Sequence, residues 1–297
     1  MVRQPQVAVV VDSSCCLPAE VVQQWGITVT PHELIIDGKP FRDGIDIYPH
    51  EFYQLLKGNQ ATLSTAAPRP QQFLEAFKEA SQRAPNVLCL TLSASFSATY
   101  QFACAAVQLT NGASSPARVE VIDSRAAAGA SGLIALAAAQ RAAAGYTLDQ
   151  VIHCVNELIP KVNLIAFLDT LYYLGRSGRM GKVQAWTGSV LGIKPVTELK
   201  LGQARMLGKP RSRAKATEQL VEIMRQRVGQ SPIWVNVMEA DAPEDALALS
   251  RRIKVQFNCR ELFVSQFTPV MGAHTGPGLL GIAFYTEGGE GPPGPAA

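Results

Sequence analysis

The sequence predicts an α/β protein of two domains, the first with a mainly parallel sheet flanked by helices and the second with a mixed sheet. The chain has 297 residues, which suggests two domains because one domain has roughly 150 residues on average. Short apolar runs alternate with helical patterns in the first half, as is typical of parallel strands joined by right-handed helical crossovers. The second half contains a hairpin pattern around Gly202, which indicates antiparallel pairing.

The first half of the chain predicts alternating strands and helices. A strand is expected over 7–11, a helix that begins at a proline over 18–26, and one strand over 27–36 before a hairpin turn at Asp37. The remaining elements expected are a helix over 70–83, a strand over 87–92, a helix from the cap residue Ser97 to about 109, a strand over 119–122 and an alanine-rich helix over 126–144.

The second half predicts another order of elements, with the boundary between the domains near 146–163. The expected elements are a strand over 164–168, a hairpin of 194–199 and 204–207, a helix over 213–228, a strand over 233–238, a helix over 243–257, and strands over 261–265 and 279–285. We therefore expect an N-terminal domain over 1–155 and a C-terminal domain over 156–286. Residues 287–297 are rich in glycine and proline and have nothing to bury, which predicts a flexible tail.

Composition and charge narrow the function classes. Basic residues number 27 and acidic residues 24, so the net charge is +3, and aromatic residues make up 7%. A protein that binds nucleic acid through phosphate contacts and base stacking usually has a higher positive net charge and more aromatic residues. Nucleic acid is therefore not an expected partner. The most apolar long stretch, 126–144, consists mostly of alanine and contains Ser131, Gln140 and Arg141. It predicts a buried helix and no stable insertion into a membrane.

The N-terminus and the cysteines favour a cytoplasmic location. The first apolar run ends at Asp12 and is too short for the apolar region of a signal peptide. No cysteines form a CxxC pair, and most lie in apolar segments, so all are expected to be reduced thiols. A redox role stays open for Cys15. The six cysteines are Cys15, Cys16, Cys89, Cys104, Cys154 and Cys259.

Two short polar segments are candidates for a ligand site, because α/β sheets bind ligands at the carboxyl ends of their strands. Residues 12–14, Asp-Ser-Ser, follow the first strand and are typical of a turn and helix cap, or of the polar part of a site. Residues 64–68 precede the helix over 70–83. There the hydroxyl of Thr65 and the backbone N–H groups of a helix N-terminus suit an anion, although a plain helix cap is the alternative.

Two further segments carry stronger signals. Residues 93–100 contain three serines and a threonine before the next helix, which is more hydroxyl than a cap requires and suits a carboxylate or phosphate. Residues 271–278 place three glycines and a proline around His274, which predicts a tight, irregular loop that lets a ligand come close. The other histidines, His32, His50 and His153, lie in ordinary strand or helix contexts and are expected to be structural or exposed.

Several motifs of other chemistries are missing from the sequence. The chain has no G-x-x-x-x-G-K-[ST], and no G-x-G-x-x-G follows the first strand, so the usual nucleotide-binding loops are not predicted. It also has no G-x-S-x-G nucleophile motif, no H-E-x-x-H and no Cys/His cluster. We therefore expect no catalytic residue and no metal site.

Taken together, the polar segments resemble the DegV family, bacterial fatty-acid-binding proteins that serve as the lipid-carrying subunit of fatty acid kinase. The resemblance runs from 7 to 285. The segments that carry it are 12–14; 65–68, with alanines in place of the family's Ser and Gln; 96–100, with Phe and Ala in place of Leu and Gly; 168–171 through 178–180 and then 193–195; and 272–278.

The resemblance implies a binding site for a long, palmitate-like fatty acid, with its acyl chain buried between or within the two domains and with no cofactor. Thr65 and Ser97 would bind the carboxylate, and His274 would line the same polar end. The alanines at 66, 67 and 98 change the donors around these hydroxyls. Further residues expected to line the site are Ser13, Ser93, Ala98, Thr99, Arg176 and Gly272.

The resemblance also implies a partner, a separate ATP-dependent fatty acid kinase subunit, because a lipid-binding protein lacks a phosphoryl donor. A basic run over 209–215 predicts that Arg211 and Arg213 dock this partner, although such a run is also typical of a solvated helix start. Arg176 and Arg179 are further docking candidates, or belong to a structural turn between the domains.

The expected function is therefore to bind a fatty acid in a buried tunnel and to present its carboxylate to the kinase, without catalysis by this chain. Two alternatives stay open. One is an enzyme acting on a small phosphorylated or carboxylated substrate, for which His274 is the candidate general acid or base. The other is a regulatory protein that senses lipid.

Overall fold

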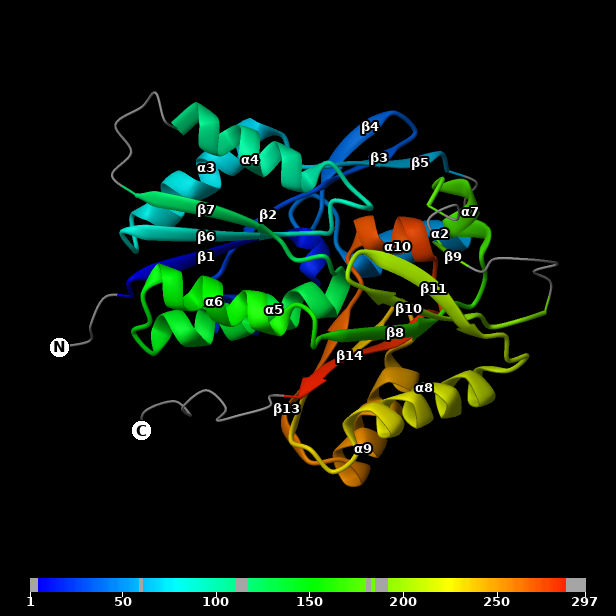
Figure 1. Cartoon of the computed structure of the whole chain (residues 1–297). Coiled ribbons are helices and arrows are strands. Elements are labelled where there is room, and N and C mark those ends of the chain that lie inside the picture. The colour runs from blue at the N-terminus through cyan, green and yellow to red at the C-terminus, as the bar shows by residue number, and fades with distance from the viewer. Residues whose placement is uncertain (1–4, 59–60, 111–116, 180–182, 185–191, 287–297) are drawn as a thin grey trace.

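Two helix-covered sheets form two α/β domains in this computed structural model, which confirms the predicted fold class (Figure 1). The structure describes residues 5–58, 61–110, 117–179, 183–184 and 192–286. The tail predicted over 287–297 lies outside the described residues. A third, smaller antiparallel sheet, which the sequence analysis did not predict, lies beside the first.

The first sheet is wholly parallel and buried on both faces. Its strand order is β2 (Thr28–Thr30), β1 (Val7–Asp12), β6 (Asn86–Thr91) and β7 (Arg118–Asp123). Every residue of β1 is buried, as expected for a strand between two helical layers. Ala8 and Val10 face α3 (Pro70–Ser81) and α4 (Thr99–Thr110), whereas Val9 and Val11 face α5 (Ala128–Ala143), beside which α6 (Leu148–Leu158) packs.

The single strand predicted over 27–36 is wrong, because this segment contributes to two sheets. β2 ends at Thr30, and β3 (Glu33–Ile36) pairs with β4 (Lys39–Arg42) and β5 (Leu63–Ala66) in the three-stranded sheet. Pro31 lies between the two strands, and a proline cannot donate a ladder hydrogen bond. The turn at Asp37 is confirmed, with φ values of 48° at Asp37 and 81° at Gly38.

The second sheet is mixed, as predicted. Its neighbours pair antiparallel except for β12 with β13 and β11 with β9. The helices α8 (Arg213–Val228) and α9 (Pro243–Gln256) cover one face. The strand order is β13 (Cys259–Gln266), β12 (Ile233–Glu239), β14 (Leu280–Thr286), β8 (Asn163–Phe167), β10 (Val196–Lys200), β11 (Gln203–Gly208) and β9 (Val183–Gln184).

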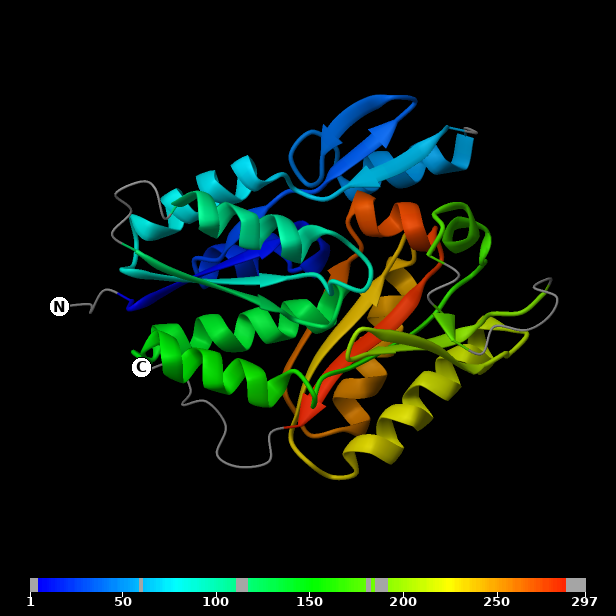
Figure 2. The ribbon, with the colours of Figure 1, turned by 45° about the horizontal axis from the view of Figure 1, so that its top comes forward.

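Helix α5 lies between the two large sheets and is the alanine-rich helix that the sequence predicts (Figures 1 and 2). Its small side chains allow both sheets to approach it closely. A Cβ atom at Gly129 would lie 2.4 Å from Asn236 Nδ2 in the second sheet, and one at Gly132 would lie 2.7 Å from the Cys15 carbonyl oxygen in the first domain. The composition of this helix therefore determines how closely the two domains pack.

Several short elements complete the chain. They are η1 (Ser13–Cys15), α1 (Ala19–Gln24), α2 (Pro49–Gly58), α7 (Tyr172–Arg176) and α10 (Pro269–Thr275). Figure 2 shows the three-stranded sheet above α10, which also packs against α2. Helix α6 spans the domain division expected at 155/156, and that division stays a prediction. In the described part of the chain, no helix combines the length and the apolar character needed to cross a bilayer.

Candidate functional site

A cavity of about 190 Å³ lies where the first sheet, α10 and the second sheet meet. From the first domain it is lined by residues that follow the parallel strands at their carboxyl ends, among them His32 after β2, Phe96 after β6 and Ala128 after β7. From the second domain it is lined by side chains such as Leu164 of β8 and Met271 of α10. The site thus lies at the edge where α/β sheets bind ligands.

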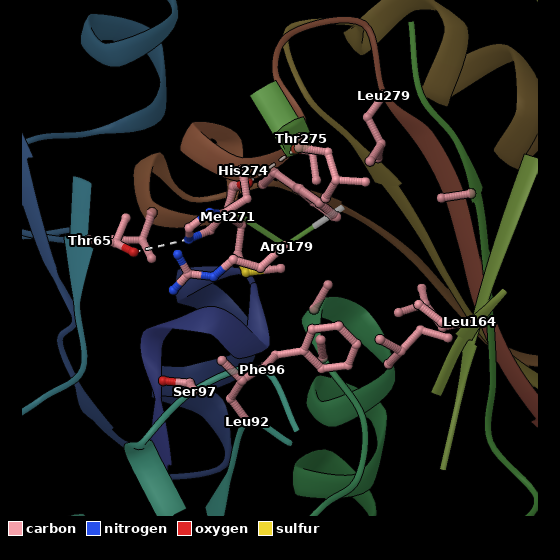
Figure 3. A pocket seen from close by; sticks show the side chains of 18 of the residues that line it. Thr65, Leu92, Phe96, Ser97, Leu164, Arg179, Met271, His274, Thr275 and Leu279 are labelled. Atoms are coloured by element: carbon pink, nitrogen blue, oxygen red, sulfur yellow. Dashed lines mark hydrogen bonds between the residues drawn. The ribbon is translucent and has the colours of Figure 1, made fainter. Parts of the chain in front are cut away.

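One end of the cavity is polar. Thr65 Oγ1 of β5 lies 3.0 Å from His274 Nε2 of α10, and Arg179 reaches the same end (Figure 3). Burial, with the nearby Arg179 and His32, lowers the pKa of His274 to about 4. The imidazole is therefore neutral near pH 7 and has one N–H to donate and one nitrogen to accept.

Ser97 is the second hydroxyl at this end, and it belongs to a short network. Ser97 Oγ lies 2.7 Å from Thr99 Oγ1 and accepts a hydrogen bond from the Thr99 N–H at 3.4 Å. Thr99 Oγ1 in turn lies 3.1 Å from His32 Nε2. Because Thr99 begins α4, the N-terminal end of this helix lies directly after Ser97.

The rest of the cavity is apolar. Aliphatic side chains of β8, β10, β11 and the segment before β14 line it, and Figure 3 shows Leu164 on the side away from Thr65. Thr197 and Glu198 of β10 also line it, but the Thr197 hydroxyl donates to the Ala166 carbonyl oxygen at 3.1 Å and the Glu198 carboxylate forms ion pairs with Arg205 and Arg227. The cavity therefore suits a molecule with one polar end and an apolar body. The aliphatic residues are Leu164, Ala166, Leu168, Leu199, Ala204 and Leu279.

The structure brings together the three residues expected to bind the carboxylate, since Thr65, Ser97 and His274 all line the cavity. The irregular loop expected around His274 is wrong, because His274 lies in the last turn of α10. Gly272 is a helical residue that packs closely on α2, where a Cβ atom would lie 2.5 Å from the Tyr53 hydroxyl oxygen. The special dihedrals fall after the helix, at Gly276 and Gly278.

Four other residues expected to line the site lie outside the cavity. Ser13 Oγ donates to Asp43 Oδ2 at 2.6 Å, and the buried Ser93 Oγ accepts from the Ser95 N–H at 3.3 Å. The exposed Arg176 donates to the Ala61 carbonyl oxygen. Ala98 lines an open hollow outside the polar end. None of these four residues lines the cavity within the described part of the chain.

Sequence reasoning missed His32, which it treated as structural or exposed. The side chain is buried and lines the cavity, and it contacts the Asp12 carboxylate of β1 as well as Thr99. Asp12 also caps η1, which confirms the predicted cap. The signal available in the sequence was position, because His32 follows a strand of the parallel sheet, as the segments 12–14 and 93–100 do.

The basic run over 209–215 divides into an exposed and an engaged part. Arg211 is exposed. Arg213 forms ion pairs with Asp169 and Asp245, donates to the Gly278 carbonyl oxygen at 2.6 Å, and lies over the Phe167 ring. Arg213 therefore joins α8 to three segments of its own domain, and its expected role in docking a partner is not supported by its contacts.

Asp169 anchors this same cluster. Burial opposes its ionisation, but the ammonium of Lys194 at 2.7 Å and the guanidinium of Arg213 at 3.0 Å lower the pKa of its carboxyl. The cluster thus joins three of the motif segments, 168–171, 193–195 and 272–278, outside the cavity. Met180, in the motif segment 178–180, lies outside the described residues.

Cys15, for which a redox role was left open, is a buried thiol. Burial, followed by the effects of its neighbours, raises the pKa of the Cys15 thiol to about 12, and a thiol that stays protonated is a poor nucleophile. Among the described residues, no group of three or more His, Cys, Asp or Glu side chains is placed to hold a metal ion.

Comparisons with known proteins agree with the fold. The model of the DegV family, which describes its members as uncharacterised, matches residues 6–287. A DegV domain-containing protein of Streptomyces coelicolor is 35% identical over 283 residues, which cover 95% of this chain and 99% of that protein. One from Caldanaerobacter subterraneus is 30% identical over 280 residues, which cover 94% and 98%.

Solved structures give the same result. The structure reported for fatty acid binding of a DegV family protein from Thermus thermophilus has a TM-score of 0.86 at 30% identity, covering 95% of this chain and 100% of that one. DegV of Bacillus subtilis, described as a fatty acid binding protein, has a TM-score of 0.85 at 26% identity over 95% and 100%. With a family model that spans nearly its whole length, this chain belongs to the DegV family.

Proposed function

We propose that this protein binds a long-chain fatty acid, with the acyl chain in the apolar part of the cavity and the carboxylate at Thr65, Ser97 and His274. The observation that carries the proposal is the division of one cavity into a mainly aliphatic body and a polar end at Thr65, Ser97 and His274. The fatty acid binding reported for the related proteins of T. thermophilus and B. subtilis supports the same ligand class.

The apolar body supplies most of the expected binding energy. Each methylene buried contributes about 0.8 kcal/mol, so a palmitate-like chain contributes on the order of 10 kcal/mol before its ordering is subtracted. The aliphatic and alanine side chains of β8, β10 and β11 provide that environment. A ligand without a long apolar chain would leave this part of the cavity unused.

The polar end compensates for the carboxylate, which would be costly to bury without donors. The Thr65 hydroxyl, which the neutral imidazole of His274 orients by donating to it, the Ser97 hydroxyl and the start of α4 offer hydrogen bonds. Arg179 adds a positive charge at the same end. Figure 3 shows Thr65, Arg179 and His274 grouped on one side of the cavity.

We further propose that the bound carboxylate is presented to an ATP-dependent kinase in the cytoplasm. The chain shows no phosphate-binding loop in its sequence, and a hollow lined by Ser97, Ala98, Phe102 and Arg179 adjoins the polar end from outside. This hollow gives a second protein a route to the head group. Arg211 is the exposed basic residue proposed to help the kinase to dock.

Native mass spectrometry of the purified protein tests the proposal. We expect an added mass equal to that of one long-chain fatty acid, which organic extraction removes and added oleate restores. The alternative function, an enzyme for a small phosphorylated or carboxylated substrate, predicts a protein that is empty as purified and stays empty with oleate. A stoichiometric added mass of a small polar metabolite would favour the enzyme.

A further inference from the structure

A chain of four side chains leads from the protein interior to the polar end of the cavity. Asp12 Oδ1 lies 3.8 Å from His32 Nδ1, and His32 Nε2 lies 3.1 Å from Thr99 Oγ1. Thr99 Oγ1 lies 2.7 Å from Ser97 Oγ, which lines the cavity. Exposed fractions of 1% for Asp12, 2% for His32 and 0% for Thr99 show that solvent does not interrupt the chain.

The Asp12 carboxylate fixes one end of this chain. It accepts hydrogen bonds from the Ser14 N–H at 3.1 Å, the Leu92 N–H at 2.6 Å and the Ser14 hydroxyl, as a charged carboxylate does. The carboxylate faces His32 Nδ1, which has no hydrogen-bond partner among the described residues. A proton on Nδ1 is attracted to that charge, whereas a lone pair there is repelled by it.

Counting hydroxyl protons then sets the direction of the other bonds. If neutral His32 keeps its proton on Nδ1, Nε2 accepts from the Thr99 hydroxyl. Thr99 has then used its only hydroxyl proton, so the short contact with Ser97 requires the Ser97 hydroxyl to donate to Thr99. In this state Ser97 has no proton left for a ligand, and it turns lone pairs toward the cavity.

A ligand carboxylate needs the opposite direction. Ser97 can donate to it only if Thr99 donates to Ser97, and this requires His32 Nε2 to donate to Thr99. With a proton also on Nδ1 beside Asp12, His32 is then an imidazolium. Moving the single proton of neutral His32 to Nε2 would instead turn the Nδ1 lone pair toward the Asp12 carboxylate.

We propose that carboxylate binding at Ser97 is coupled to uptake of one proton by His32, which reverses the hydrogen-bond direction between His32, Thr99 and Ser97. His32 is thus a positioning residue that sets whether Ser97 donates or accepts. The inference rests on the proposed fatty-acid function, and it extends that function to the protonation state of the complex.

The other charged groups around His32 are compatible with this assignment. Asp43, whose N–H donates to the His32 carbonyl oxygen at 2.9 Å, faces it from the segment after β4 and adds a second carboxylate, whose pKa burial raises. His274 and Arg179 line the same cavity as His32. Since the pKa of His274 is lowered to about 4, His274 is neutral in the free protein between about pH 6 and 9.

The test is isothermal titration calorimetry of the full chain with dodecanoate, kept monomeric and ionised, at about pH 8 in two buffers of different ionisation enthalpy. We expect uptake of close to one proton per ligand bound. The affinity should also fall by up to about tenfold per pH unit wherever His32 is neutral in the free protein. In ¹⁵N spectra of histidine-labelled protein, both ring nitrogens of His32 should become protonated on binding.

Two variants and one control test whether the proton uptake depends on His32 and Thr99. Thr99→Val breaks the chain while keeping the side-chain shape, and His32→Gln replaces Nε2 with an amide that donates at every pH. Both should bind dodecanoate with proton uptake close to zero. Thr30→Val is the matched control, because Thr30 is 1% exposed and its hydroxyl has no hydrogen-bond partner among the described residues. Its proton uptake should equal that of the wild type.

The outcomes separate this inference from the function on which it rests. Binding of dodecanoate by the wild type without proton uptake overturns the inference and leaves the function standing. So does a ¹³C shift of labelled dodecanoate that shows a neutral carboxylic acid in the complex, since the proton would then be on the ligand. Failure of the wild type to bind any fatty acid overturns both.

Discussion

His274 Nε2 and Thr65 Oγ1 lie 3.0 Å apart, although 209 positions separate the two residues in the chain. The contact joins α10, which connects strands of the mixed sheet, to the three-stranded sheet of the N-terminal half. For Thr65 to donate its proton to a carboxylate, the imidazole must donate to Thr65 from Nε2. The contact therefore depends on how the two halves of the chain pack, and it determines whether the Thr65 hydroxyl can donate to a ligand.

The lowered pKa of His274 predicts a dependence of stability on pH. In the folded protein the pKa is about 4, against an ordinary value of 6.5. Between these values the unfolded chain binds a proton that the folded chain does not, so stability is complete above pH 6.5 and is lost as the pH falls toward 4. The loss amounts to about 3 kcal/mol.

Urea unfolding of the wild type and of His274→Gln near pH 7 and near pH 4.5 checks this. The free energy of unfolding of the wild type should fall by about 2–3 kcal/mol more than that of the variant. Equal losses in the two proteins would show that His274 does not titrate abnormally.

Arg213 is expected to stabilise the fold. Removing its side chain in Arg213→Ala breaks the ion pairs with Asp169 and Asp245 and leaves the Gly278 carbonyl oxygen without this donor. The free energy of unfolding in urea should fall by about 1–3 kcal/mol. The matched change Arg211→Ala, at an exposed position in the same run, should alter it by less than about 0.5 kcal/mol. A similar loss of unfolding free energy in the two variants would contradict a stabilising role specific to Arg213.

Arg211 is expected to act on the partner and not on the lipid. We predict that Arg211→Ala slows phosphorylation of bound fatty acid by the cognate kinase several-fold at low salt, with unchanged affinity for the fatty acid. The difference from the wild type should shrink as salt screens the charge, because exposed charges act mainly on the encounter rate. Arg118→Ala, another exposed arginine, on β7, serves as the control. Equal rates for wild type and Arg211→Ala at low salt would remove Arg211 from the docking surface.

Gly129 is predicted to be required for the packing of α5 between the sheets. In Gly129→Ala the new Cβ would lie 2.4 Å from Asn236 Nδ2 and 2.7 Å from Met238 Sδ, so the helix must shift away from the second sheet. Overpacking of this kind costs about 1–3 kcal/mol, which exceeds the gain in helix propensity of about 1 kcal/mol. Urea unfolding measures the loss, and Ala143→Val at the exposed end of α5 should show little. Unchanged stability of Gly129→Ala would mean that the sheets are not held this closely.

The sequence predicts the architecture well wherever the period of apolar residues reflects local structure. The apolar run at the start of the chain indicated a strand of a parallel sheet, and the alanine content of 126–144 indicated a buried helix, as β1 and α5 show. The division of 27–36 between two sheets was not predictable in this way. Both halves of that segment contain strand-forming β-branched residues, and the break at Pro31 depends on which strands pair with each half.

In the site, too, features that depend on contacts between distant residues could not be predicted from the sequence. Thr65, Ser97 and His274 were identified through motifs, and the structure places all three on one cavity. His274 was expected in a loop because three glycines surround it, yet Gly272 serves close packing of α10 on α2. His32 carried no motif, and its role depends on contacts with Asp12 and Thr99, which are distant in sequence. Chemistry built from such distant residues becomes visible only in three dimensions.

The most direct test of the central claim is displacement of a fluorescent fatty acid from the wild type, Thr65→Ala, Ser97→Ala and the double variant. Loss of one charge-assisted hydrogen bond costs roughly 1.5–3 kcal/mol, so each single change should weaken binding roughly ten- to a hundredfold. The double change should nearly abolish it. Ser64→Ala, on the exposed side of β5, should bind like the wild type. Wild-type affinity in the double variant would contradict the assignment of these hydroxyls to the carboxylate.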